Sequence, residues 1–269
     1  MTQKLTVLVM LAAVACARND SHIHKIVPVL DVLVDAVNEV SVLVSVIEPA
    51  TCDTGMVEVA GEFCPQRAET CLRWIDKGDD PKMCAEFAKP TKCLSKKLVP
   101  MQFCIDAHEW PNKENELPAV NVSWWDAKSS CESVGKRLCT YDESVFACEG
   151  QEGKPYPYGD GYHRDDAACG AGKKWIDPWK NSFETVDQRD PLGSHPNCVS
   201  DFGVIGAVAG VDEWVDNERG SMHGYPWRSG LHGGHFVAGV RNRCRAITAT
   251  HSPDTVLYAI GYRCCKSLF

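Results

Sequence analysis

The chain has 269 residues, 44% of them hydrophobic, which is enough for one large domain with an appendage. Its net charge is −8 and it has no basic tract, which argues against nucleic acid and an anionic membrane surface as electrostatic partners. Fifteen cysteines are too many for a reducing cytosol, and none stands in a Cys-x-x-Cys pair. Disulfide bonds are therefore favoured over a zinc ribbon.

The first residues predict export from the cytoplasm. Lys4 precedes a short apolar run that ends at Ala15, so residues 1–15 are typical of a signal peptide. Residues 13–16 also match a bacterial lipoprotein cleavage box, in which Cys16 is acylated; simple cleavage that leaves Cys16 as a free thiol is the alternative. Parity favours acylation, because 15 − 1 = 14 cysteines can all pair. We expect a lipid anchor on Cys16 in a membrane of the bacterial cell envelope, facing the periplasm or the cell surface.

Residues 16–50 predict a helical stalk or linker. Apolar residues recur four and three positions apart through residues 26–47, at Ile26, Leu30, Leu33, Val37, Val40, Val44 and Ile47. This heptad pattern favours a helix, and three carboxylates within the run argue against a membrane span. A helix that docks on the main domain and a stalk that self-associates remain as alternatives.

Residues 51–269 predict one domain, of which residues 51–104 are an extra cysteine-rich N-terminal part. Six cysteines fall in this part, and we expect disulfides to hold it because it can bury little. Residues 56–63 read as a strand and residues 71–76 as a short helix. Residues 159–200 are rich in Gly, Pro, Asp and Asn, which predicts long loops.

The first of two central helices has both a start and a stop signal. Ser123 is a good N-cap, and Asp126 is placed to reach back to its backbone. The helix is expected over about residues 124–134, where Gly135 ends it. It carries Cys131.

The second helix has the same kind of start signal. Thr140 and Glu143 form the sequence pattern of a capping box, and the helix is expected to end near Gly150. It carries Cys148, and an aromatic turn at residues 156–160 follows it.

These motifs resemble the formylglycine-generating enzyme (sulfatase-modifying factor) family. The family has a Val-Ser-Trp start, a helix with a cysteine, Gly-Lys-Arg-Leu, a second helix and an aromatic-Gly-Asp turn. The matching residues are Val122-Ser123-Trp124, Cys131, Gly135-Lys136-Arg137-Leu138, Cys148 and Tyr158-Gly159-Asp160. Residues 201–214 and 233–264 resemble later family segments in the same order, so the likeness extends over roughly residues 56–265.

The resemblance implies an α+β fold, a disulfide-rich variant of the C-type lectin fold with two helices and a twisted antiparallel core. Strand-like pieces at residues 246–250 and 261–265 fit it. By matched position the family pairing gives two disulfides, Cys131–Cys264 and Cys148–Cys244. The connectivity of the other cysteines stays open.

The same resemblance implies chemistry that this chain lacks. Enzymes of the family use two cysteines that bind copper(I) and activate oxygen, and they oxidise a sulfatase cysteine to formylglycine; a soft monovalent metal needs such thiolates. The first catalytic position corresponds to Ala238, and the second falls in a shortened loop near Gly239. Cys244 matches a structural cysteine. Copper is therefore not expected.

Two weaker metal hypotheses remain. In the family segment that helps to bind calcium, Gly210 replaces an asparagine, whereas Glu213 is kept and Asp212 is new; a calcium site and a plain turn stay as alternatives. His232 and His235 flank two glycines and supply two nitrogen ligands, against the alternative of an exposed His- and Gly-rich loop.

Arg241, Arg243 and Arg245 alternate in sequence, which predicts one face of a strand that points toward an anionic ligand or a carboxylate. Ion pairing at the surface is the alternative.

Two functions follow from these observations. The first is an exported lipoprotein, anchored through Cys16, whose domain is a non-catalytic or diverged module that binds a small-molecule or protein ligand at the cell envelope. The second is an oxidoreductase of the family that acts on an exported protein or peptide, or that uses another metal through His232 and His235. Whether the protein is an enzyme stays open.

Overall fold

The computed structural model describes residues 51–75, 83–220 and 224–268. The predicted signal peptide, Cys16 and the heptad pattern lie outside the described residues. Within the described part, no helix is long and apolar enough to cross a membrane.

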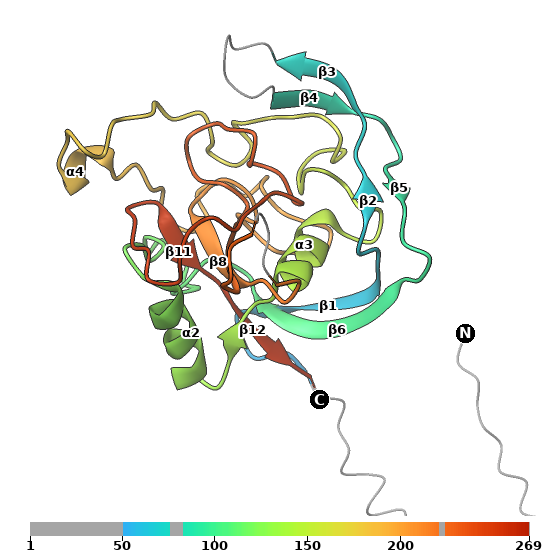
Figure 1. The fold of residues 1–269 in the computed structure, drawn as a ribbon, viewed down its shortest axis with the longest axis horizontal. Coiled ribbons are helices and arrows are strands. Elements are labelled where there is room, and N and C mark those ends of the chain that lie inside the picture. Colours follow the sequence, from blue (N-terminus) through green and yellow to red (C-terminus); the bar gives the residue numbers. More distant parts are fainter. Residues whose placement is uncertain (1–50, 76–82, 221–223, 269) are drawn as a thin grey trace, which may run out of the picture. The chain divides into compact units, whose positions relative to one another are not determined.

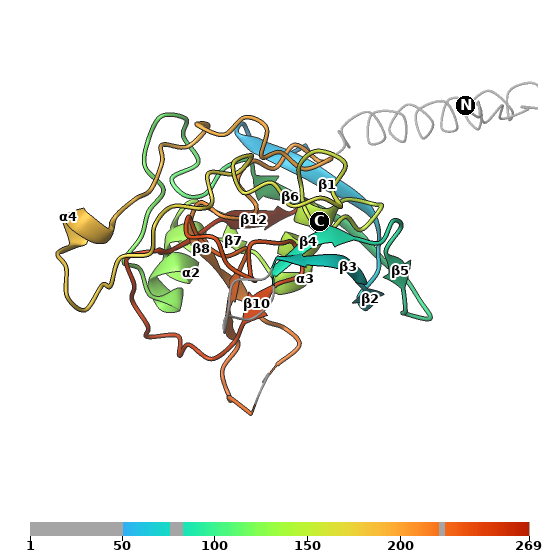
Figure 2. The same ribbon diagram turned by 90° about the horizontal axis from the view of Figure 1, so that it is seen from above.

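Two four-stranded sheets form the centre of the described domain (Figures 1 and 2). In order across the first sheet, the strands are β1 (Met56–Phe63), β6 (Val99–Asp106), β12 (Cys264–Ser267) and β7 (Arg137–Leu138). The second sheet has the order β10 (Ile247–Thr248), β9 (Ser229–His232), β8 (Asp212–Asp216) and β11 (Ile260–Tyr262). The first sheet is antiparallel, but β11 and β8 run parallel, so the core is not antiparallel throughout.

The predicted opening strand is confirmed as β1. Its side chains alternate between the core and the solvent, so that Val59 and Phe63 are buried and Ala60 is exposed. β1 pairs along its whole length with β6, from Met56 opposite Asp106 to Phe63 opposite Val99.

Both central helices are confirmed, as α2 (Trp124–Ser133) and α3 (Tyr141–Glu149), and both have the predicted capping boxes. The Ser123 hydroxyl accepts from the Asp126 N–H at 3.1 Å, and the Asp126 carboxylate accepts from the Ser123 N–H at 3.0 Å. These bonds satisfy amide groups that the first turn of a helix leaves unpaired. Between α3 and β8 the described chain is mostly loops, with one helical turn, α4 (Phe183–Val186), as predicted.

Two tryptophans join α2 to the second sheet. The Trp124 Nε1–H donates to the Val215 carbonyl at 3.0 Å, and the Trp214 Nε1–H donates to the Val122 carbonyl at 2.9 Å. Both rings are buried, so each indole finds the partner that a buried N–H requires.

The helix predicted for residues 71–76 is wrong. Residues Cys71–Ile75 form strand β3, which pairs with β4 (Met83–Phe87). The run contains Trp74 and Ile75, which favour strands, and the Cys71–Cys84 disulfide joins the two strands. A shorter pair, β2 (Arg67–Ala68) and β5 (Lys92–Cys93), lies beside it in the cysteine-rich part.

Seven disulfides hold the described domain. They are Cys52–Cys104, Cys64–Cys93, Cys71–Cys84, Cys131–Cys264, Cys139–Cys265, Cys148–Cys244 and Cys169–Cys198. The fourth and sixth are the two pairs that the family resemblance implied. All fourteen cysteines of residues 51–269 are thus bonded, which leaves Cys16, outside the described part, as the fifteenth.

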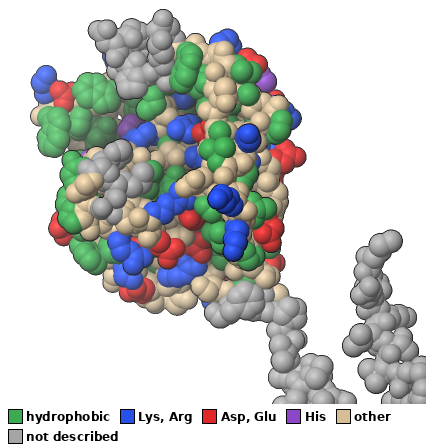
Figure 3. All heavy atoms as spheres, turned by 45° about the vertical axis from the view of Figure 1, so that its right-hand side comes forward, with side chains coloured by type: hydrophobic (Ala, Val, Ile, Leu, Met, Phe, Trp, Pro, Cys, Tyr) green, Lys and Arg blue, Asp and Glu red, His purple; other side chains and the backbone are tan. Residues whose placement is uncertain are grey.

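Charged side chains of both signs lie among hydrophobic ones on the face that Figure 3 shows. Lys or Arg and Asp or Glu often lie side by side there. Lys128 and Glu132 on α2 form one exposed ion pair of this kind. Such exposed pairs contribute little to stability, and they agree with the absence of a basic tract in the sequence.

Candidate functional site

The segment from Gly233 to Cys244 is where the resemblance places catalysis, and it follows strand β9 directly. Gly233 and Gly234 have φ of 89° and 72°, which favour glycine. A Cβ on Gly233 would lie 2.7 Å from the Ala207 carbonyl oxygen, so the turn depends on the missing side chain.

Hydrogen bonds from Asn242 fix the loop around Ala238 and Gly239. The Gly239 N–H donates to the Asn242 Oδ1 at 2.7 Å, and the Asn242 Nδ2 donates to the His235 carbonyl at 2.7 Å. Asn242 is buried. The two positions matched to the catalytic cysteines thus carry no thiol, and Cys244 is held in its disulfide with Cys148.

Backbone groups engage both candidate metal-binding histidines. His232, on β9, is buried, and its Nε2 lies 2.6 Å from the Cys244 carbonyl, to which it donates. Burial lowers the pKa of His232, which favours the neutral ring. The Nδ1 of His235 accepts from the Val237 N–H at 3.1 Å. Across the described ranges, no group of three or more His, Cys, Asp and Glu side chains is placed to hold a metal ion.

The two carboxylates at the start of β8 are both paired with arginine. Asp212 forms an ion pair with Arg241, and Glu213 forms one with Arg263. The Arg263 Nη2 donates to the Glu213 Oε1 at 2.8 Å, and its Nε donates to both Glu213 oxygens at 3.1 and 3.2 Å.

Arg263 joins the two sheets. Its Nη1 donates to the carbonyls of Asp106 and Ala107, at 2.9 and 3.0 Å, where β6 ends. Its Nη2 donates to the Ile205 carbonyl at 2.9 Å. A second carboxylate, that of Glu109, lies 3.8 Å from the Nη2. The Arg263 side chain is 2% exposed, so one buried cation serves two buried carboxylates and three backbone carbonyls.

The same geometry tests the calcium hypothesis. Gly210 has φ of 49°, and a Cβ there would lie 2.2 Å from the Glu109 Oε1. The Glu109 carboxylate therefore fills the space that an asparagine side chain would need, and Arg263 donates to both oxygens of Glu213. A site that already holds a guanidinium cation does not fit calcium, which needs six to eight oxygen ligands.

We expect the Glu109→Gln substitution to flatten the pH dependence of stability. Burial raises the pKa of Glu109 to about 7 from 4.5, with Arg263 opposing the shift. An acid with a raised folded-state pKa contributes stability below about pH 4.5, and this contribution is lost as the pH rises through 7. Urea unfolding at pH 5 and pH 8 should show wild type losing about 2–3 kcal/mol more than Glu109→Gln. Equal losses in the two proteins would contradict this assignment.

The three alternating arginines do not lie on a strand. Only Ile247–Thr248 forms a strand here, and residues 241–246 form a turn. Instead of sharing one face of a ladder, the arginines separate and pair with Asp212, Glu69 and Glu149, respectively. The strand prediction is wrong because the Cys148–Cys244 bond and the buried Asn242 fix a turn at this place.

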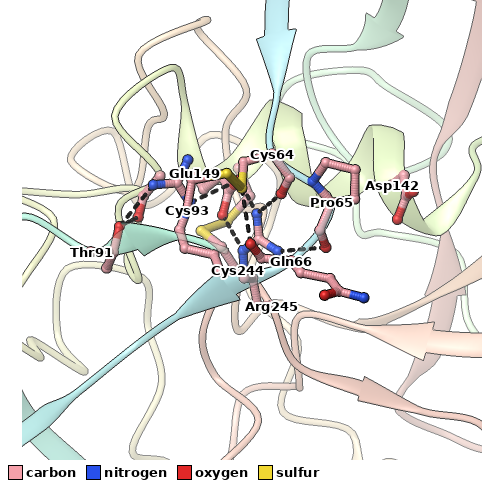
Figure 4. A network of polar contacts seen from close by, with 12 residues as sticks. Cys64, Pro65, Gln66, Thr91, Cys93, Asp142, Glu149, Cys244 and Arg245 are labelled. Carbon is pink, nitrogen blue, oxygen red and sulfur yellow. Dashed lines mark hydrogen bonds and ion pairs between the residues drawn. A yellow bond between two sulfur atoms is a disulfide. The ribbon is translucent and has the colours of Figure 1, made fainter. Parts of the chain in front are cut away.

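Arg245 forms hydrogen bonds with both a carboxylate and backbone carbonyls (Figure 4). Its Nε and Nη2 both donate to the Glu149 carboxylate at 2.6 Å, and further bonds reach the carbonyls of Cys64 and Pro65 at 2.6 and 3.2 Å. Glu149 has no exposed side-chain surface. This bidentate pair ties α3 to the cysteine-rich part and is structural.

Comparison with known proteins decides the family. A family model described as a sulfatase-modifying factor enzyme 1-like domain matches residues 86–268. The chain belongs to this family. The resemblance seen in the sequence is thereby confirmed.

The curated relatives of this sulfatase-modifying-factor chain are named as inactive. The chain is 30% identical over 159 residues to the inactive C-alpha-formylglycine-generating enzyme 2 of Bos taurus. The aligned region covers 55% of this chain and 50% of that protein. The Mus musculus protein of the same name is 26% identical over 168 residues, with 56% and 50% covered. The chain spans about half the length of these relatives.

Among solved structures, PvdO from Pseudomonas aeruginosa has a TM-score of 0.51 at 17% identity, over 82% of this chain and 99% of PvdO. This likeness shows a shared fold. The structure of CarF has a TM-score of 0.48 at 16% identity, over 79% of this chain and 97% of CarF.

Proposed function

We propose that this protein is an exported bacterial lipoprotein whose sulfatase-modifying-factor domain is a non-catalytic module that binds a ligand or a protein at the cell envelope. One observation carries the non-catalytic half of the proposal. Ala238 and Gly239 stand where the family has its catalytic cysteines, and all fourteen cysteines of residues 51–269 are in disulfides. A copper(I) centre needs thiolates, and this part of the chain offers none.

The relatives support the non-catalytic half of the proposal, because both are named as inactive enzymes. The envelope half rests on the sequence: a signal peptide over residues 1–15, an acylated Cys16, and the heptad run at 26–47 as a stalk, with self-association as one way to bury its apolar seam. Disulfides also fit an oxidising compartment.

The alternative is an oxidoreductase of the family that acts on an exported protein or peptide. The family membership favours it. It requires two free thiols, or a metal site that includes His232 and His235, whose Nε2 and Nδ1, respectively, are hydrogen-bonded to backbone groups.

A thiol count on the purified full-length protein, with copper analysis of the same sample, tests the proposal. We expect no free thiol before reduction, fourteen thiols after full reduction in denaturant, and no bound copper. Fifteen thiols after reduction would show that Cys16 is not acylated. Two free thiols in the unreduced protein, together with copper, would overturn the non-catalytic assignment, and a formylglycine assay on a sulfatase peptide would then follow.

A further inference from the structure

A groove of about 420 Å³ lies between the β3–β4 hairpin and residues 240–247. Its walls come from segments far apart in the sequence, including Trp74 on β3, Arg164, and Arg243. Its volume falls within the range of small-molecule sites, roughly 300–1,000 Å³.

Arginines dominate the lining of this groove. Four arginines and one carboxylate, that of Glu69, line it. Two of the four arginines already have several hydrogen-bond partners within the protein. Arg245 is bonded as described above. The Arg164 Nε donates to Asp166 at 2.7 Å, and its Nη2 donates to the Gly239 carbonyl at 3.0 Å.

Arg241 and Arg243 differ from the other two because they keep spare donors. Each meets a single carboxylate among the described residues, Asp212 and Glu69 respectively. Their side chains are 31% and 32% exposed. The Arg241 Nη1 is buried without a hydrogen-bond partner in the described part of the chain. A guanidinium has five N–H donors, and one carboxylate takes at most two in a fork, so each arginine can receive a further oxyanion.

The rest of the groove is apolar. Trp74 is 52% exposed although it stands on a strand, and Val240 is 37% exposed. Phe87 and Tyr156 are buried beneath them, with ring centroids 5.7 Å apart. An exposed indole and two guanidinium groups that line the same groove suit a ligand that has a flat apolar body and a negative end.

We propose that this groove binds a small organic anion, with its oxyanion on Arg241 and Arg243 and its apolar body against Trp74. The inference rests on the proposed binding function and names its ligand class. Glu69 competes with the ligand for Arg243, so this internal carboxylate lowers the affinity of the site for anions.

Calorimetric titration of the full-length protein with phenylacetate, phenyl phosphate and uncharged phenylacetamide tests the inference. We expect at least one of the two anions to bind and the amide not to bind; the two anions separate a carboxylate site from a phosphate site. Arg243→Gln should weaken anion binding about tenfold to a hundredfold, the range for a lost charge-assisted hydrogen bond. Glu69→Gln should tighten it, because the competing carboxylate is gone.

Arg73→Gln is the matched control. Arg73 lies next to Trp74 on the same strand but is 63% exposed and faces Glu86, with the Nε 3.6 Å from its Oε2, so its loss should leave binding unchanged. Failure of both anions to bind folded wild type would overturn the inference, as would equal affinity in wild type and in a folded Arg243→Gln. This outcome is independent of the thiol and copper result, so the two proposals can fail separately.

Discussion

Replacing Arg263 by methionine is expected to lower the free energy of unfolding by about 3–5 kcal/mol, the range for breaking a buried ion pair from one side. The substitution leaves the Glu213 and Glu109 carboxylates buried without their cation. It also removes the hydrogen bonds that Arg263 donates to the carbonyls of Asp106, Ala107 and Ile205. Each lost bond to a buried group adds to the cost.

Denaturant unfolding at pH 8, under oxidising conditions, measures this effect. The triple variant Arg263→Met/Glu109→Gln/Glu213→Gln should recover part of the loss, because neutral amides do not need a buried cation. Arg228→Met is a surface control: its pair with Asp216 is 57% exposed on the arginine side, and we expect a change within about 0.5 kcal/mol. If Arg263→Met behaves like Arg228→Met, the internal ion cluster does not hold the two sheets together.

Removing the Cys131–Cys264 and Cys139–Cys265 disulfides together is expected to cost far more than twice the removal of one. The two bonds close nearly the same loop, with sequence separations of 133 and 126 residues. When one bond is removed, the other still closes the long loop. What is lost is only the small ring between the two bonds, whose longer arm spans 139 − 131 = 8 residues. The chain-entropy relation gives about 2.5 kcal/mol for the small ring and about 5 kcal/mol for the long loop, so removing one bond costs about 2.5 kcal/mol and removing both costs about 7.5 kcal/mol.

A cycle of cysteine-to-alanine variants measures this coupling: each pair alone, both pairs, and Cys71→Ala/Cys84→Ala as a control that opens a separate loop of 13 residues. The control should add to either single removal within about 0.5 kcal/mol, because it shares no loop with them. Strict additivity of the two long-loop bonds would contradict a shared closure.

Sequence reasoning worked where the signal was local. The capping boxes of α2 and α3 each lie within four consecutive residues, and they set the start of both helices correctly. The two predicted disulfides depended on family motifs and not on spacing, because fourteen cysteines allow very many pairings.

Long-range partners could not be predicted. Arg243 finds Glu69 at a separation of 174 residues, and Arg245 finds Glu149 at 96. Nothing near Arg263 in the sequence reveals that Glu109 and Glu213 enclose it. The error at residues 71–76 has a similar cause, because pairing with β4 and the Cys71–Cys84 bond outweigh any local helical preference.

The position of β12 has a consequence for the order in which the first sheet can form. This strand comes from residues 264–267, far from β6 and β7 in the sequence, yet it lies between these two strands in the first sheet. A chain in which residues 264–267 have not docked can pair β1 with β6 but leaves the other edge of β6 unpaired, and an open edge invites pairing with other chains. Completion of the first sheet therefore waits for residues 264–267, and a chain in which they have not yet docked exposes the edge of β6.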